Sequence, residues 1–225
     1  YLSMGSTELM GAGVNNSPYE NAYVSVFGRV NYNYKSKYYA QANFRYDGSG
    51  RFKKGNRWGF FPSVSAGWVL TQEKFMEGAR GVLSFLKLRA SYGQLGNDRI
   101  GNYPYQSTLS SNDPVGFIGS AGLVQALQGF SAYQMLLDDI TWETTETYDV
   151  GIDANFFDDR LRITADYYKK TTRDMLILVD IPSYLGYTAP YKNSGDMNTK
   201  GWDLSVAWSD RIGEDFSYSV AVNLS

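Results

Sequence analysis

Apolar and polar residues alternate along most of this chain. In the stretch ETYDVGIDANFFDDRLRITADYYKKT, which begins at Glu146, every second residue from Tyr148 to Phe156 and from Leu161 to Tyr167 is apolar or aromatic. The apolar set is Tyr148, Val150, Ile152, Ala154 and Phe156, and after the turn Leu161, Ile163, Ala165 and Tyr167. Successive side chains of a strand point to opposite faces, so the pattern predicts a hairpin with one apolar face and one polar face.

The polar face of this predicted hairpin is too charged for a dry protein core. It carries Asp153, Asn155, Arg162 and Asp166. Burying a charged group without a partner costs roughly several kcal/mol or more of free energy. We therefore expect water on this side of the hairpin and an apolar environment on the other.

The same two-residue period recurs in six further segments. Strands are predicted over 24–34, 38–46, 60–70, 86–92, 202–208 and 216–224. Together with the first hairpin they make about eight strands, and at most a short helical turn is expected between Gln72 and Phe85.

The turn at 35–37 sets the register of the first predicted hairpin. It places Val30 opposite Ala42, and two further pairs follow along the same strands, Tyr32 with Ala40 and Tyr34 with Tyr38. This register keeps both apolar sets on one face. Phe27 is the exception, because it is aromatic at a position that belongs to the polar face.

The predicted connections differ in length in a regular way. Those at 35–37, 157–160 and 209–215 are short, that at 71–85 is intermediate, and those at 47–58, about 96–140 and about 172–198 are long. Every other connection is long, so one end of the sheet carries short turns and the other carries long loops. This asymmetry is typical of an outer-membrane barrel, with short periplasmic turns and longer extracellular loops.

Aromatic residues gather near both ends of the predicted apolar face. The short-turn end has Tyr32, Tyr34, Tyr38, Trp68, Phe156, Trp208 and Phe216. The long-loop end has Tyr46, Phe60, Tyr92, Tyr148, Tyr167 and Trp202. Aromatic girdles on either side of an aliphatic belt are typical of strands that cross a bilayer.

Composition excludes several kinds of chemistry. The chain has 225 residues, a net charge of -2, no cysteine and no histidine. Disulfides, thiolate metal sites and histidine general bases are therefore absent, and a nucleic-acid partner is not expected. The sequence lacks the phosphate-binding, zinc-protease and nucleophile-elbow motifs. We predict no catalytic residue, cofactor or metal site, and hence no enzyme.

Several stretches, in their order and spacing, resemble a known family. They are FRYDGSGRF (44–52), NRWGFFPSVSAGW (56–68), LKLRASYGQLGN (86–97), ITWETTETYDVGID (140–153), DYYKKTTRDML (166–176) and NTKGWDLSVAW (198–208). In these stretches the chain resembles the TonB-dependent outer-membrane transporters of the SusC/RagA type, which are found in Bacteroidetes. The resemblance runs over most of the chain from about residue 22.

The resemblance implies an all-β fold, an antiparallel transmembrane β-barrel. About eight strands would lie here, out of the roughly 22 of a barrel with a plugged lumen. Residues 1–225 would be part of one barrel domain, with 1–21 a loop or incoming strand and 22–225 about four hairpins with long extracellular loops. The chain ends within a predicted strand, so we expect a piece of the C-terminal half of the barrel, with the plug domain outside this chain.

The resemblance also implies function and partners. It predicts an importer of glycan or peptide oligomers in the outer membrane of a Gram-negative bacterium. A SusD-like lipoprotein would cover the extracellular face, and TonB would act through the N-terminal part that is absent here. The lipid bilayer and the oligomeric nutrient complete the expected partners.

Candidate contacts for ligand or lipoprotein lie in the long predicted loops. They are the aromatic residues Tyr103, Tyr105, Phe130, Tyr133, Tyr184, Tyr187 and Tyr191. Such side chains stack on sugar rings or pack against a partner protein, and loops are where binding residues concentrate. The alternative is that they pack against neighbouring loops.

Two other functions remain open from the sequence. A small self-contained barrel with an adhesion or structural role would fill its interior with side chains. Its ion network would consist of Arg29, Arg45, Arg89, Asp153 and Arg162. A soluble carbohydrate-binding β-sandwich would also show alternation, with its apolar face covered by a second sheet.

Overall fold

The computed structural model describes most of residues 20–225. The exceptions are residues 103, 107–108, 119–123, 133–134, 136–138 and 214, and between 109 and 131 it describes strand backbone alone.

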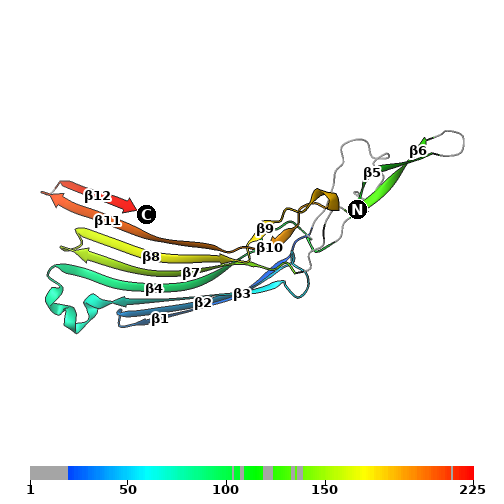
Figure 1. The fold of residues 1–225 in the computed structure, drawn as a ribbon. Coiled ribbons are helices and arrows are strands. Elements are labelled where there is room, and N and C mark those ends of the chain that lie inside the picture. Colours follow the sequence, from blue (N-terminus) through cyan, green and yellow to red (C-terminus); the bar gives the residue numbers. More distant parts are fainter. Residues whose placement is uncertain are drawn as a thin grey trace.

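Eight strands form one antiparallel sheet, in which each strand pairs with the next of the eight along the chain (Figure 1). They are β1 (Tyr23–Tyr34), β2 (Tyr38–Ser49), β3 (Trp58–Val69), β4 (Leu83–Asn97), β7 (Glu143–Phe156), β8 (Leu161–Arg173), β11 (Met197–Ile212) and β12 (Phe216–Leu224). The sheet is open, because the described part of the chain pairs β1 with β2 alone and β12 with β11 alone. The predicted eight-strand, all-β antiparallel fold is confirmed, whereas a closed eight-stranded barrel would have paired β1 with β12.

The short and long connections lie at opposite ends of the sheet, as the sequence predicts (Figure 1). Two short 3-10 helices, η2 (Leu70–Gln72) and η3 (Lys74–Ala79), occupy the connection where a short helical turn was expected. No helix in the described ranges is long and apolar enough to cross a membrane.

The two longest connections contain strands of their own, which the sequence analysis treated as loop. One carries the hairpin β5 (Leu109–Ile118) and β6 (Val124–Ala132). The other carries β9 (Leu176–Leu178) and β10 (Tyr191–Asn193), with the 3-10 helix η4 (Ser183–Leu185) between them. These strands are short or lie outside the sheet, so they lack the long run of alternation by which the other strands are found.

The predicted register of β1 and β2 is confirmed. Val30 lies opposite Ala42, and the pairs Tyr32 with Ala40 and Tyr34 with Tyr38 follow. Lys35 and Ser36 adopt positive φ angles of 53° and 54°, which give the tight turn that closes this hairpin. The Ser36 amide donates to the Asn33 side-chain oxygen at 3.1 Å and fixes the turn further.

One face of the sheet leaves its apolar side chains uncovered. Val30 is 68% exposed, and Val150 and Val220 are 61% and 59% exposed. Few apolar side chains in the described part of the chain are buried, among them Phe52, Phe61, Val69, Ile100, Ile140, Trp142 and Ala154. A β-sandwich would bury this face under a second sheet. The exposed face instead needs an apolar environment, as the outer face of a membrane barrel has in lipid.

Aromatic side chains form rows across the strands at both ends of the apolar face. At the long-loop end, Tyr46 lies opposite Phe60 and Trp202 lies opposite Tyr167. On the strands between these pairs, Tyr92 lies opposite Tyr148, with ring centroids 4.8 Å apart.

At the short-turn end, Tyr38 lies between Tyr34 and Trp68, with ring centroids 6.4 Å and 6.3 Å away. The two rows bound an aliphatic belt, as the sequence predicts.

Glu73 holds the short-turn end of β2 and β3 to the adjacent connection. Its carboxylate accepts hydrogen bonds from the Tyr38 hydroxyl at 2.7 Å, from the Lys37 ammonium at 3.1 Å and from the Trp68 indole at 3.3 Å. These hydrogen bonds, led by that from Tyr38 and followed by that from Lys37, lower the pKa of Glu73. The carboxylate therefore stays ionised and anchors the aromatic row beside it.

Candidate functional site

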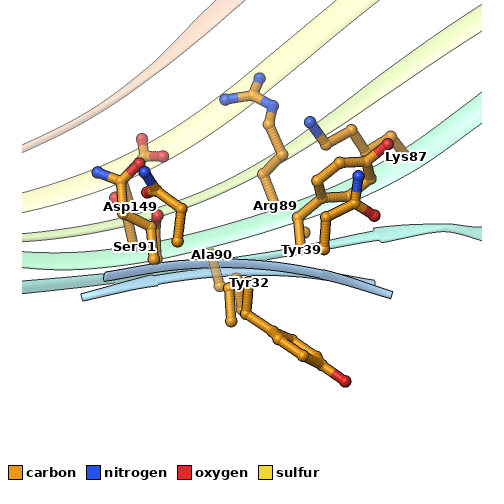
Figure 2. Close-up of a pocket in the computed structure, with 14 residues that line it drawn as sticks. Tyr32, Tyr39, Lys87, Arg89, Ala90, Ser91 and Asp149 are labelled. Carbon is orange, nitrogen blue, oxygen red and sulfur yellow. The ribbon is translucent and has the colours of Figure 1, made fainter. Parts of the chain in front are cut away.

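The face opposite the apolar belt forms a polar wall. Figure 2 shows Tyr39, Lys87, Arg89, Ser91 and Asp149 on one side of the sheet and Tyr32 on the other. This separation follows from the two-residue period of the strands. Asn31, Gln41 and Ser65 line the same hollow, so neutral hydrogen-bonding groups surround the charged ones.

Arg89 is the centre of an ion network that joins three strands. From β4, its Nε and Nη2 atoms donate to the two carboxylate oxygens of Asp153 on β7, at 2.8 Å and 3.0 Å. Its Nη2 atom also donates to Asp166 on β8 at 3.0 Å. Bidentate pairs between arginine and carboxylate fix geometry as well as charge. The network therefore ties this part of the wall into one arrangement.

Gly151 makes the bond between Arg89 and Asp166 possible. It lies on β7 between these two residues, opposite Arg89 on one side and Asp166 on the other. A Cβ atom at this position would overlap the Asp166 carboxylate and lie 2.9 Å from the Arg89 Nη2 atom. Arg89 thus reaches a carboxylate two strands away across a residue without a side chain.

The charges on the wall do not balance locally. Lys87 lies over the Tyr39 ring, 5.2 Å from its centroid, and Arg89 is shared by two carboxylates. Asp149 and Asp203 add two more carboxylates to the same face of β7 and β11. The described residues contain no group of His, Cys, Asp or Glu side chains that could hold a metal ion. The arrangement offers a hydrogen-bonding surface with an acidic stripe.

A small apolar core organises the long-loop end of the sheet. Its buried members are Phe52, Phe61, Ile100, Ile140 and Trp142. Trp142 is central, because the rings of Phe52 and Phe61 both lie 5.3 Å from it. Leu176 and Tyr191, from the hairpin β9–β10, pack against this core. All three long connections therefore meet at one point.

Hydrogen bonds add to this junction. The Asn193 amide donates to the Thr141 carbonyl at 2.9 Å, and the Thr141 amide donates back to the Asn193 side-chain oxygen at 2.8 Å. The Leu176 amide donates to a Glu143 carboxylate oxygen at 3.1 Å. Hairpin β9–β10 is thus attached to the start of β7 by backbone groups as well as by packing.

We expect replacement of Trp142 by alanine to loosen the long connections without unfolding the sheet. Trp142 is 5% exposed, and removal of such a side chain typically costs about 3–5 kcal/mol. Limited trypsin digestion of the folded receptor should cleave at the exposed residues Arg99 and Lys192 at least about tenfold faster, because cleavage follows local opening.

Trp58→Ala is the matched control for this experiment. Trp58 is 47% exposed and stacks on Tyr46 outside the core, so its removal should leave both cleavage rates nearly unchanged. Equal acceleration by the two substitutions would contradict a specific role of Trp142 at the junction.

The structure places four of the seven aromatic residues that the sequence singled out. Tyr184 is 84% exposed on η4 and Tyr187 is 44% exposed just after it. Tyr105 is partly buried, and Tyr191 is partly buried against the small core. Tyr103, Tyr133 and the side chain of Phe130 lie outside the described residues. A ligand role for any of the seven stays a prediction.

Neither the ion network around Arg89 nor the small apolar core was predicted from the sequence as a site. As members of an ion network, Arg89 and Asp153 were named only for the alternative of a small self-contained barrel, and Gly151 was not named. One signal in the sequence could have pointed to the network. Gly151 lies at a polar-face position of its strand, and the strands on either side carry Arg89 and Asp166. The core residues come from separate connections and show no common period in the sequence.

Comparisons with known proteins agree on one family. The profile of the family "TonB dependent receptor-like, beta-barrel" matches residues 3–225. TonB-dependent receptor P39 of Formosa agariphila is 37% identical over 205 residues, which are 91% of this chain and 19% of that protein. TonB-dependent receptor SusC of Bacteroides thetaiotaomicron is 31% identical over 207 residues, 91% of this chain and 20% of that protein.

A solved structure, described as the RagAB peptide transporter, superposes with a TM-score of 0.77 at 32% identity. The match covers 90% of this chain and 21% of that one. This chain thus spans about a fifth of the length of the curated relatives it matches.

Proposed function

Because this chain belongs to the TonB-dependent receptor β-barrel family, we propose that it forms part of the wall of a nutrient importer. Family membership places it in the outer membrane of a Gram-negative bacterium, as predicted from the sequence. It also confirms the expectation that the chain is not an enzyme, because its relatives are receptors and transporters.

The observation that carries this proposal is the two-faced sheet. Its outer face is apolar between two aromatic rows and suits lipid. Its inner face carries Asn31, Gln41, Ser65 and Ser91 among charged groups and suits a hydrated solute. A wall of this kind separates lipid from a polar lumen, and this role requires no catalytic residue.

The cargo that we propose is a hydrophilic oligomer, either a peptide or a glycan. The RagAB relative is described as a peptide transporter, and SusC is a receptor of the same family. The exposed rings of Tyr184 and Tyr187 are suited to stacking on a sugar or packing on a partner protein. We place the long-loop end at the cell surface, where a SusD-like lipoprotein would meet these loops. Energy would come from TonB through a part of the receptor outside this chain.

Nutrient depletion by whole cells tests this function. A strain without the receptor should stop depleting one class of oligomer, peptide or glycan, from a defined medium, and the wild-type gene should restore depletion. A strain without TonB should show the same loss. Depletion of both classes at the wild-type rate in the receptor deletion would contradict import.

A variant tests the loop contacts within the same assay. Tyr184→Ala with Tyr187→Ala should leave the receptor level unchanged, because both side chains are exposed. At low nutrient concentration it should slow depletion by at least about 30-fold, since a single hot-spot aromatic contributes roughly 2 kcal/mol or more. A tagged receptor should also retain a SusD-like lipoprotein, and the double variant should retain less. An unchanged rate and unchanged retention would remove these two residues from the site.

A further inference from the structure

Two lysines face each other on the apolar side of the sheet. Lys169 on β8 lies directly opposite Lys200 on β11. The neighbouring pair on the same face, two residues toward the aliphatic belt, is Tyr167 with Trp202, and each of these is 54% exposed. Because side chains two apart share a face, both lysines project on the lipid-facing side, just beyond the aromatic row.

This arrangement is unfavourable without a ligand. Directly opposite residues of an antiparallel pair have Cβ atoms about 4.5–5.5 Å apart, and like charges at that spacing destabilise the pair. Within the described ranges neither ammonium group has an ion pair with a carboxylate. Glu146, the nearest acid on this face in register, lies 3.7 Å from Arg173 and accepts a hydrogen bond from Gln94.

The two lysines lie at headgroup level, because they follow the lipid-facing pair Tyr167 and Trp202 by two residues on β8 and β11. In register they continue the row of Tyr92 on β4 and Tyr148 on β7. Tyrosine and lysine both place a polar tip at the membrane interface while their stems cover apolar surface. Tyr148 is 51% exposed and offers a phenol hydroxyl beside Lys169. The row therefore presents two positive charges and hydroxyl donors to the lipid headgroups.

We propose that Lys169 and Lys200 together bind the phosphate group of an anionic lipid headgroup. One phosphate between two ammonium groups would replace their repulsion with two charge-assisted hydrogen bonds. The occupant is a lipid because the row is continuous with the lipid-facing aromatic residues Tyr167 and Trp202. The lipid belongs to the leaflet at the long-loop end of the sheet. This inference depends on the membrane location and not on the cargo.

Native mass spectrometry of the full-length receptor tests the proposal, with phosphatidic acid as the probe and phosphatidylcholine as the neutral reference. The wild type should retain one phosphatidic acid that K169Q/K200Q loses, with affinity lowered about 30-fold, since each lysine near an anionic headgroup contributes about fivefold. K169R/K200R should keep the lipid. The matched control is K170Q/K192Q, because Lys170 lies on the other face of β8 and Lys192 lies on β10.

A thermal melt in neutral lipid separates binding from folding. There K169Q/K200Q should unfold no lower than the wild type, because the substitutions remove a repulsion, and added phosphatidic acid should raise the melting temperature of the wild type alone. Equal retention of phosphatidic acid by K169Q/K200Q and the wild type would overturn the proposal. Complete displacement of the lipid by millimolar inorganic phosphate would also overturn it, because the site would then select a free anion.

Discussion

Replacing Ile152 with arginine is expected to prevent assembly of the receptor in the outer membrane. Ile152 lies on the apolar face, midway along β7 between Tyr148 and Phe156. The residues in register with it on β4, β8, β11 and β12 are aliphatic: Leu88, Ala165, Leu204 and Leu224. A charge on the lipid face near the bilayer midplane costs about 2–4 kcal/mol. The folded receptor, measured by its heat-sensitive mobility on a gel of outer membranes, should fall to a small fraction of the wild-type level.

Two further variants separate the effect of the added charge from the effects of its position and of side-chain size. Ile152→Leu keeps the apolar character and should assemble normally. Ser91→Arg introduces the same charge on the polar wall, next to Asp149 in register, and should be far better tolerated. If Asp153→Leu reduced the folded receptor more than Ile152→Arg did, the two faces would be assigned the wrong way round.

Replacing Gly151 with alanine is expected to break the bond between Arg89 and Asp166. The new Cβ atom would overlap the Asp166 carboxylate, so one of the two charged side chains must move. Overpacking of this kind typically costs about 1–3 kcal/mol. Urea unfolding of the purified receptor in lipid discs should show a lower midpoint. Gly93→Ala, on the polar wall of β4, is the control, because its Cβ atom would meet only the Ser63 Cβ atom, at 3.4 Å.

A double variant shows whether the cost arises at Asp166. In a receptor that already carries Asp166→Ala, the space beside Gly151 is empty, and Gly151→Ala should then cost little. Costs that simply add in the double variant would contradict the overlap, since residues that share a contact are not expected to be additive.

The alternation of apolar and polar residues was sufficient to predict the sheet but not to predict where its strands end. Strand β7 begins at Glu143 and β8 ends at Arg173, although the predicted alternation covered only 147–156 and 161–168. Beyond the aromatic row both faces of these strands meet polar surroundings. The contrast between faces then disappears, while the backbone pairing continues. Where both faces of a strand are polar, the two-residue period therefore cannot predict the end of the strand.

Features formed by residues from separate connections could not be predicted. Phe52 and Trp142 come from different loops and meet only because the strands between them bring the loops together. The ion network depends on which residues face each other across three strands. Register beyond the tight hairpins is set by the sheet as a whole, so Arg89, Gly151 and Asp166 could be aligned only in the structure.

The most direct test of the central claim, that one face of this sheet meets lipid and the other a polar lumen, compares two adjacent residues. Val64 and Ser65 lie midway along β3 and point to opposite faces. In a receptor without other cysteines, spin labels at Val64→Cys and Ser65→Cys would be measured by their collisions with oxygen and with a water-soluble nickel complex. The account predicts that oxygen dominates at Val64 and that the nickel complex is more accessible at Ser65. The opposite order at the two positions would contradict it.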